Sequence, residues 1–423
     1  MITRKIINEL LLLTKEYPIV TILGPRQAGK TTLAKSFLKG YQYSNLEVPE
    51  ERQFAQDDAK AYLAQFNGKV IIDEIQRVPQ LLSYLQVLVD ADESGETGKY
   101  ILTGSHQLQL REAVSQSLAG RTAVLNLLPL SVDELSDHGT YLKGFEDYCY
   151  TGFLPRIYDR SLRPSTAYSN YYQTYVERDV RLLINLRNLA LFDKLLKLLA
   201  GRVGQVINFN RLSNDVGVDL KTIKSWLMIL EASFIVFKLP PYFENFGKRV
   251  IKSPKYYFTD VGLLSFLLGI SKAEQIPRDP LVGHIFENLV VLECLKARYN
   301  QGKMADIYYY RDSRGHEVDL IWKDGRDLVA IEIKSAATFS SSQLKGLKKF
   351  QSIASHSSNV TQSFLVYNGQ SRQLSNGMQA LHFADTARIF DAALTDEQAT
   401  ARSAQADERA TAQADERPTE QGE

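Results

Sequence analysis

Residues 24–31 carry the residue types that bind the phosphates of a nucleotide. They read Gly-Pro-Arg-Gln-Ala-Gly-Lys-Thr and match the pattern G-x-x-x-x-G-K-[ST] at every fixed position. An apolar segment, Ile19–Leu23, precedes them and a helical one, Thr32–Leu38, follows, which is the context that this pattern requires. Backbone N–H groups of such a loop hold phosphate oxygens. The predicted ATP-binding residues are therefore Gly24, Pro25, Arg26, Gln27, Ala28, Gly29, Lys30, Thr31 and Thr32.

The chemistry of the predicted site follows from three side-chain types. Lys30 would neutralise the β- and γ-phosphates, and the Thr31 hydroxyl would ligate Mg²⁺. About forty residues on, the apolar segment Val70–Ile72 ends in Asp73 and Glu74. Asp73 would hold Mg²⁺ from its outer shell, and Glu74 would polarise the attacking water. Alone, two carboxylates at a strand end would be ordinary solvated groups, but the upstream loop favours the catalytic interpretation.

Two further features resemble parts of an ATP-hydrolysing machine. The segment Tyr100–Leu102 is followed by Thr103 and Ser105, either of which could sense the γ-phosphate; a capped strand end is the alternative. Arg121 stands just before the apolar segment Ala123–Leu127. An arginine there resembles an arginine finger, which stabilises charge on the transferred phosphoryl group, usually from a neighbouring subunit. If Arg121 is an arginine finger, the chain is expected to form a homo-oligomer. The alternative is that Arg121 is an ordinary surface residue, which implies no oligomer.

The apolar segments of residues 18–135 indicate the fold class of this part. The segments at 19–23, 70–72 and 100–103 are nearly continuous apolar runs, as buried parallel strands are. Helical stretches alternate with them, so we predict an α/β nucleotide-binding layer. The expected organisation is an ATPase core at 1–135, a helical lid at 136–204, a third module at 205–275, an α/β domain at 276–390 and a polar tail at 391–423. We expect the tail to be disordered after about residue 395 because it is poor in apolar residues.

The order of these motifs resembles one family closely. Gly-Pro-Arg-Gln-x-Gly-Lys-Thr-Thr, Asp-Glu-Ile-Gln, Leu-Thr-Gly-Ser and Leu-Ala-Gly-Arg look like bacterial and archaeal AAA+ ATPases that carry a C-terminal domain of unknown function related to nucleases. The segments 151–155 and 175–180 are similar to the lid region of that family, although Phe153-Leu-Pro155 departs from its usual aromatic-Pro order. The resemblance spans most of residues 17–340 and implies an AAA+ P-loop domain.

Residues 205–275 read as a winged helix. Leu220, Ile223, Leu227 and Leu230 fall on one helical face that starts after Asp219, and two apolar segments bracket a Pro/Gly-containing hairpin. Helix–turn–helix followed by a hairpin is typical of a winged-helix module that binds DNA, although such modules also serve as packing units. The predicted DNA-contact residues are Lys221, Lys224, Lys248, Arg249, Lys252 and Lys255.

The α/β domain at 276–390 contains charged residues in a pattern that resembles PD-(D/E)xK nucleases, with a restriction-endonuclease-like fold. Glu287 lies in a predicted helix, Asp319 in a strand, and Glu332 and Lys334 share one face of the next strand. If the hairpin turns at 324–325, Asp319 lies about one diagonal step from Glu332, and Glu317 shares the face.

The charges of these residues suggest their roles. Asp319 and Glu332 would bind a second divalent metal, Lys334 would stabilise the attacking hydroxide or the phosphate, and Glu287 would complete the shell. Alternatively the fold survives as a binding platform without cleavage.

Composition narrows the partners and the compartment. The formal net charge of +1 over 423 residues gives no global field for nucleic acid, so DNA binding requires a local patch. Cys149 and Cys294 lack metal-type spacing, which favours a reducing, cytoplasmic compartment. No apolar run reaches about 18 residues, so we expect no membrane span. Two functions remain open: an ATPase acting on DNA, and an ATP-gated regulatory switch with an inactive nuclease fold.

Overall fold

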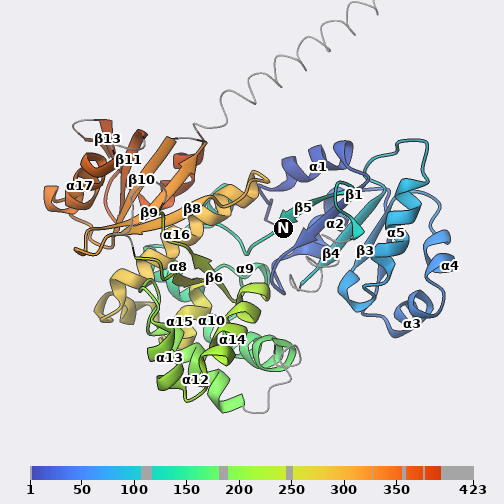
Figure 1. Cartoon of the computed structure of the whole chain (residues 1–423), viewed down its shortest axis with the longest axis horizontal. Coiled ribbons are helices and arrows are strands. Elements are labelled where there is room, and N and C mark those ends of the chain that lie inside the picture. The colour runs from blue at the N-terminus through green and yellow to red at the C-terminus, as the bar shows by residue number, and fades with distance from the viewer. Residues whose placement is uncertain are drawn as a thin grey trace, which may run out of the picture.

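The computed structural model of the chain describes residues 2–105, 117–180, 189–243, 251–325, 327–354, 359–374 and 377–391. The predicted DNA-contact residues Lys248 and Arg249, and the polar tail from residue 392, lie outside the described residues. Figure 1 shows a blue α/β part, a green-to-yellow helical part and an orange-to-red α/β part. None of the helices in the described ranges combines the length and apolar character needed to span a lipid bilayer.

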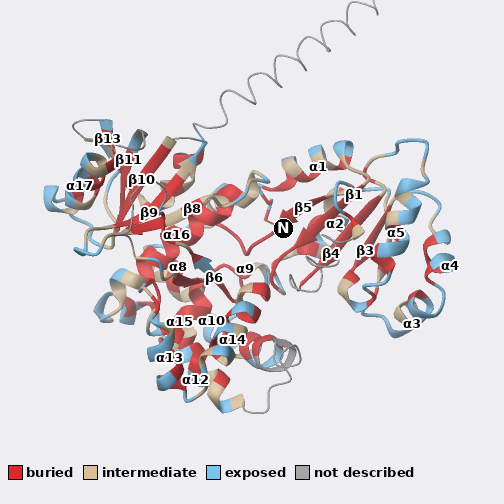
Figure 2. Ribbon diagram, in the orientation of Figure 1, coloured by how far each residue is buried: buried red, intermediate tan, exposed pale blue. Residues whose placement is uncertain are grey.

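The first part is a parallel sheet in the order β2-β3-β4-β1-β5. Its central strands are completely buried, which explains why their sequences are nearly continuous apolar runs (Figure 2). The strands are β1 (Ile19–Leu23), β2 (Gln42–Asn45), β3 (Val70–Asp73), β4 (Tyr100–Gly104) and β5 (Thr122–Asn126). The helices are α1 (Ile7–Glu16), α2 (Lys30–Phe37), α3 (Pro49–Asp57), α4 (Ala59–Ala64), the 3₁₀ turn η1 (Ile75–Arg77) and α5 (Leu81–Asp90). The predicted α/β layer is confirmed, and β4 lies between β1 and β3.

The second part is mainly helical. Its elements are α7 (Val132–Asp137), α8 (Phe145–Thr151), α9 (Pro155–Asp159), α10 (Pro164–Tyr171), the π-helical η2 (Tyr172–Val180), α12 (Leu189–Ala200), α13 (Phe209–Val216), α14 (Leu220–Ala232), β6 (Val236–Leu239), β7 (Lys255–Phe258), α15 (Val261–Leu267) and η4 (Ala273–Arg278). Helix α14 begins after Asp219, whose carboxylate accepts from the backbone N–H of Thr222, as the sequence predicts. Two helices followed by the antiparallel pair β6–β7 agree with the predicted elements. Their assignment as a winged helix stays a prediction.

The third part is a mixed sheet in the order β12-β13-β11-β10-β9-β8, preceded by a long helix. The helix α16 (Val282–Asn300) is buried along most of its length. The remaining elements are β8 (Ile307–Arg311), β9 (Glu317–Asp324), β10 (Asp327–Lys334), η5 (Ser341–Leu344), α17 (Lys345–Ala354), β11 (Asn359–Tyr367), β12 (Arg372–Gln373), β13 (Met378–His382) and η7 (Phe383–Phe390). Strands β9 and β10 pair antiparallel, so the predicted hairpin is confirmed.

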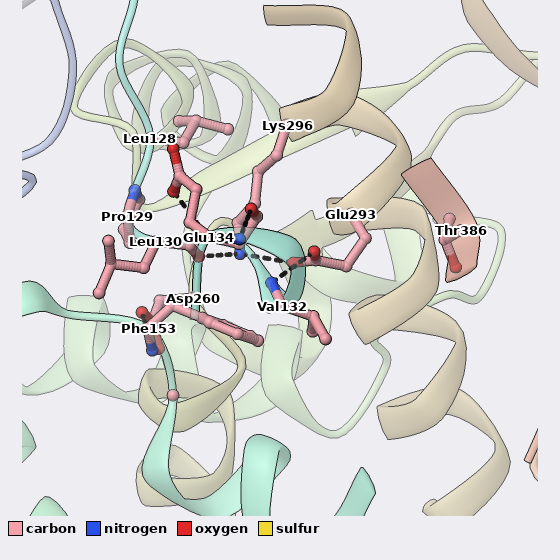
Figure 3. A network of polar contacts seen from close by, with 12 residues as sticks. Leu128, Pro129, Leu130, Val132, Glu134, Phe153, Asp260, Glu293, Lys296 and Thr386 are labelled. Carbon is pink, nitrogen blue, oxygen red and sulfur yellow. Dashed lines mark hydrogen bonds and ion pairs between the residues drawn. The ribbon is translucent and has the colours of Figure 1, made fainter. Parts of the chain in front are cut away.

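A buried polar network ties α16 to the segment that leaves β5 (Figure 3). The ammonium of Lys296 donates to the carbonyl of Leu130 at 2.7 Å and lies 2.8 Å from Glu293 Oε1. The other oxygen of Glu293 accepts from the backbone N–H of Val132 at 2.8 Å. Lys296 also lies 3.6 Å from the ring centroid of Phe153, ahead of α9. Every charge in this network is therefore neutralised or hydrogen-bonded, as burial requires.

A second buried ion pair holds the phosphate-binding loop in place. Arg4 lies 3.1 Å from Glu134, at the first turn of α7, and donates to the carbonyls of Ala28 and Leu128 at 2.8 and 2.6 Å. Both side chains of the pair are buried. The loop that carries the nucleotide motif is thus anchored from behind to the start of the helical part.

Candidate functional sites

A cavity of about 790 Å³ opens where the carboxyl ends of the sheet strands face the helical part. One wall comes from the phosphate-binding loop and Glu74, and the other from α9 and η2. The loop contributes Arg26, Gln27, Gly29, Lys30, Thr31 and Thr32, and the helical wall contributes Pro155, Arg156, Asp159, Arg160, Leu162, Thr174 and Tyr175. This volume is of the size that cofactor sites have.

Two glycines shape the loop. A Cβ at Gly24 would lie 2.0 Å from the carbonyl oxygen of Leu127, so only glycine fits against the end of β5. Gly29 has a φ of +92°, a left-handed conformation, at the N-terminus of α2. The ammonium of Lys30 folds back to donate to the carbonyls of Gly24 and Pro25, at 2.9 and 2.8 Å. Burial disfavours the charged form of Lys30 and lowers its pKa to about 8. A bound phosphate would stabilise the charged form again.

Asp73 gathers the hydroxyl groups around the predicted magnesium position. One of its oxygens accepts from Thr31 and from Tyr43, each at 2.8 Å, and the other accepts from Thr103. The carboxylate is buried, at 4% exposure. A hydroxyl and a carboxylate side by side are the hard oxygen donors that Mg²⁺ prefers, so these residues fit the ion. Tyr43 was not predicted, because its strand β2 is a half-exposed edge with a weak sequence signal.

Glu74 lies one residue further, in a strained position. Its φ of +58° is rare for a residue with a side chain, and such strain is concentrated at functional sites. Its carboxylate contacts the Gln76 amide and the Ser105 hydroxyl, the latter at 3.3 Å. The two predicted sensor candidates thus make different contacts: the Thr103 hydroxyl donates to Asp73 and accepts from the backbone N–H of Glu74 at 3.3 Å, whereas Ser105 contacts the Glu74 carboxylate.

Arg121 directly precedes β5, at the amino ends of the sheet strands, whereas the cavity lies at their carboxyl ends. Its guanidinium pairs with Asp90 of α5 through two nitrogens, at 2.5 and 2.7 Å, and its carbonyl accepts from Ile19 N at the start of β1. Arg121 therefore does not line the cavity of its own chain. A role in hydrolysis would require a second copy.

Arg156 and Arg160 are cavity residues that the sequence reasoning missed. Both belong to the α9 region and line the wall opposite Lys30. They follow the segment 151–155, which resembled a family lid, but no spacing rule connects them to the phosphate-binding loop far upstream. The signal that could have found them is their place directly after that segment.

A second cavity, of about 740 Å³, collects the predicted nuclease residues. It is lined by Glu287, Glu317, Asp319, Glu332 and Lys334, together with Lys255. The register pairs Ile331 with Leu320, which brings Asp319 directly opposite Glu332 rather than one diagonal step away. The difference arises because β9 continues to Asp324 and pairs there with Asp327, whereas a turn at 324–325 would have ended the strand one residue earlier.

Two ammonium groups pair with the four carboxylates of this second cavity. Lys334 lies 3.1 Å from Asp319 and 2.7 Å from Glu332. Lys255 lies 3.0 Å from Glu287 and 2.7 Å from Glu317, and Tyr257 donates to Glu287 at 2.6 Å. In the described part of the chain, no three His, Cys, Asp or Glu side chains are arranged to hold a metal ion. In this arrangement the carboxylates do not fit the predicted divalent metal centre, because the ammonium groups of Lys255 and Lys334 already contact their oxygens.

The pKa values in the second cavity reflect burial and these neighbours. Burial, and then the charge of Asp319, raises the pKa of Glu332 to about 8. Burial alone would raise the pKa of Glu287 too, but Lys255 holds it at about 2. The Oε2 atom of Glu332 is buried without a hydrogen-bond partner. Lys334 contacts only the other oxygen of this carboxylate, so protonation of Glu332 or a further cation would stabilise the unpaired oxygen.

The predicted DNA contacts divide into two groups. Lys221, Lys224 and Lys252 are exposed, as a contact surface requires. Lys255 is 2% exposed and held in the second cavity, so the prediction that it contacts DNA is wrong. In the sequence, Lys255 looked like one more basic residue of the hairpin. Its partners Glu287 and Glu317 lie far along the chain, so local spacing could not identify its burial.

The fold and the first cavity define a P-loop ATPase domain of the AAA type. A family model described as "AAA domain" matches residues 16–136. Two further models, described as domains of unknown function DUF8612 and DUF4143, match residues 142–274 and 282–385.

The chain belongs to the same family as the uncharacterized protein Rv2008c of Mycobacterium tuberculosis. The two are 32% identical over 327 residues, which cover 76% of this chain and 71% of the relative. An uncharacterized protein of Haemophilus influenzae is 25% identical over 352 residues, covering 74% of this chain and 82% of the relative.

Among solved structures, the Walker-type ATPase PABY2304 of Pyrococcus abyssi is similar at 14% identity. The match covers 63% of this chain and 96% of that chain, with a TM-score of 0.40. A Signal Transduction ATPase with Numerous Domains from Pyrococcus horikoshii, PH0952, is similar at 15% identity, covering 71% and 47%, with a TM-score of 0.22. Both likenesses are distant.

Two substitutions in the first cavity should separate binding from turnover. Lys30→Ala removes the ammonium that answers the phosphate charge and should abolish ATP binding. Glu74→Gln keeps the loop and should bind ATP with hydrolysis reduced by 100-fold or more, on the order expected for loss of a general base. Isothermal titration and phosphate release measure the two properties. Wild-type hydrolysis in both variants would rule out this site.

Proposed function

We propose that the chain binds ATP with Mg²⁺ and hydrolyses it at the cavity between the sheet and α9. The observation that carries this proposal is the 2.8 Å contact between the Thr31 hydroxyl and Asp73, with Glu74 on the same edge. Lys30 would turn from its backbone carbonyls to the phosphates, and Thr31 and Asp73 would hold Mg²⁺. The ion supplies charge neutralisation at the phosphates, while Glu74 orients the attacking water.

The helical wall of the cavity gives hydrolysis a structural consequence. Arg156 and Arg160 face the phosphate-binding loop from α9, and Pro155 lies 3.9 Å from the position of a Cβ at Gly29. Nucleotide phosphates would attract these arginines and draw α9 towards the loop, and their release would remove that attraction. ATP would thus act as a switch between two positions of the helical part.

We further propose that this switch acts on DNA. The exposed lysines Lys221 and Lys224 on α14, and Lys252 before β7, support this partner. Arg121 would act in a homo-oligomer, where its place at the amino ends of the sheet strands could face the cavity of a second copy. The lysine-paired carboxylates of the second cavity favour a module that binds without cutting, which is the regulatory-switch form of the proposal.

Metal-dependent cleavage of phosphodiesters is the second candidate function. Asp319, Glu332 and Lys334 meet in one cavity beside Glu287, and Glu332 Oε2 has no partner among the described residues. A divalent ion there would activate water for attack on phosphorus. Because Lys334 and Lys255 occupy the carboxylates, no step through such an ion follows from the geometry.

The rate of ATP hydrolysis, measured with and without DNA over a range of protein concentrations, tests the DNA and oligomer proposals together. We expect DNA to raise the rate and the rate per chain to rise with concentration. Arg121→Ala should remove the concentration dependence with little change in ATP affinity, because a finger acts on the transition state. A rate independent of both DNA and concentration would contradict both proposals.

Calorimetric titration with Mn²⁺, in the absence of nucleotide, separates the two candidates for the second cavity. If the cavity is a nuclease centre, wild type binds the ion there and Asp319→Ala and Glu332→Ala abolish that binding. Nicking of branched or single-stranded DNA should then disappear in Lys334→Ala while the ion still binds. The geometry with lysines paired to the carboxylates predicts no ion binding at this cavity. Tight binding that depends on Asp319 would contradict it.

A further inference from the structure

The surface that connects the second cavity to α17 is basic and rich in hydroxyl groups. We call it the α17 surface, and it consists of Ser335, Thr338, Ser341, Lys345, Lys348 and Lys349. The chain runs without interruption from Lys334, in the cavity, through these residues.

The three lysines form one face of α17. They are spaced i, i+3 and i+4, so they lie together on the helix, and all three are exposed. Within the described ranges, none of their ammonium groups has an ion-pair or hydrogen-bond partner. The helix contains no acidic residue, and its opposite face buries Leu347 and Phe350 in the core. The lysines therefore repel one another weakly, and a bound anion would relieve that repulsion.

The hydroxyl groups come from a loop held in a fixed shape. Ser340 caps the turn η5, with its N–H donating to Gln343 Oε1 at 2.8 Å, and Gln343 donates back to the carbonyl of Thr338. The side chains of Ser335, Thr338 and Ser341 make no hydrogen bond to any other described residue. Hydroxyls and lysines presented by a fixed loop and helix are the donors that typically contact nucleic-acid phosphates.

The α17 surface reaches the second cavity directly. Ser335 lines that cavity, and a Cβ at Gly346 would lie 2.8 Å from Glu332 Oε2. The first turn of α17 therefore packs on the carboxylate of Glu332. An anion that followed the lysines along α17 would arrive beside Lys334. In Figure 1, α17 lies at the end of the molecule opposite α3 and α4.

We propose that the α17 surface binds the phosphate backbone of a nucleic-acid strand and leads it to the second cavity. This rests on the proposed action on DNA and adds the contact surface on the C-terminal domain. With a net charge of only +1, the chain requires such a local patch for phosphate binding. The unpaired hydroxyls favour a phosphate backbone over an acidic protein, since they suit repeated phosphate oxygens.

The experiment is fluorescence anisotropy of labelled single-stranded and duplex DNA at several salt concentrations. The variant is Lys345→Gln, Lys348→Gln and Lys349→Gln in the full chain. The control changes Lys15, Lys39 and Lys60 to Gln, which removes the same charge from exposed positions on the ATPase domain. A third variant carries arginine at the three α17 positions. Equal melting temperatures establish that each variant is folded.

The α17 glutamine variant should bind more weakly, with a salt slope shallower by about 2 for single strands and nearly 3 for duplex. The control and the arginine variant should bind like wild type. If wild type binds DNA and both glutamine variants bind equally well or are equally weakened, this inference is wrong while the DNA role survives elsewhere. If wild type binds no DNA at any salt concentration, the proposed action on DNA fails as well.

Discussion

The buried ammonium of Lys296 is the constraint on which the arrangement of the three parts depends. A charge at 2% exposure is tolerated only when its partners are fixed, and those partners come from different parts of the chain. Glu293 lies on the same helix, whereas Leu130 belongs to the segment leaving the ATPase sheet and Phe153 to the segment before α9. Removal of one partner of such a buried pair typically costs about 3–5 kcal/mol. The position of α9 at the ATP cavity thus depends on α16.

The other end of α16 supports the second cavity. Glu287 holds Lys255 and Tyr257 of β7, and the side chain of Asn288 accepts from and donates to the backbone of Phe258, at 2.8 and 2.9 Å. Two residues beyond β7, Asp260 accepts from the backbone N–H of Phe153 at 3.0 Å. Helix α16 and strand β7 are therefore connected by hydrogen bonds and ion pairs to residues at both cavities. This connection is the structural basis on which an ATP-dependent switch could reach the C-terminal domain.

Local patterns in the sequence predicted the parts of the site that local chemistry determines. The phosphate-binding loop, Asp73 and Glu74 lie on one edge because parallel strands bring their carboxyl ends together. Long-range partners could not be predicted in this way. Lys255 looked like one more residue of a basic hairpin, yet burial beside Glu287 determines its role. Arg156 and Arg160 join the ATP cavity only because the helical part folds back over the loop.

The register of the C-terminal sheet is a second feature that local sequence patterns predicted only in part. The Glu-x-Lys spacing correctly placed Glu332 and Lys334 on one face, since side chains alternate along a strand. Whether Asp319 stands opposite or diagonal to Glu332 depends on one residue in the turn. Lys334 places a positive charge beside both Asp319 and Glu332, so the proximity of these two carboxylates does not by itself require a metal ion.

A crystal structure with Mg²⁺ and a non-hydrolysable ATP analogue tests the assignment of the ATP site most directly. The account predicts the triphosphate on the loop, with Lys30 released from the carbonyls of Gly24 and Pro25 and bound to phosphate oxygens. Thr31 and Asp73 should lie at the Mg²⁺ ion, with Glu74 next to a water facing the γ-phosphate. A nucleotide bound elsewhere, with Lys30 still on its two carbonyls, would contradict the account.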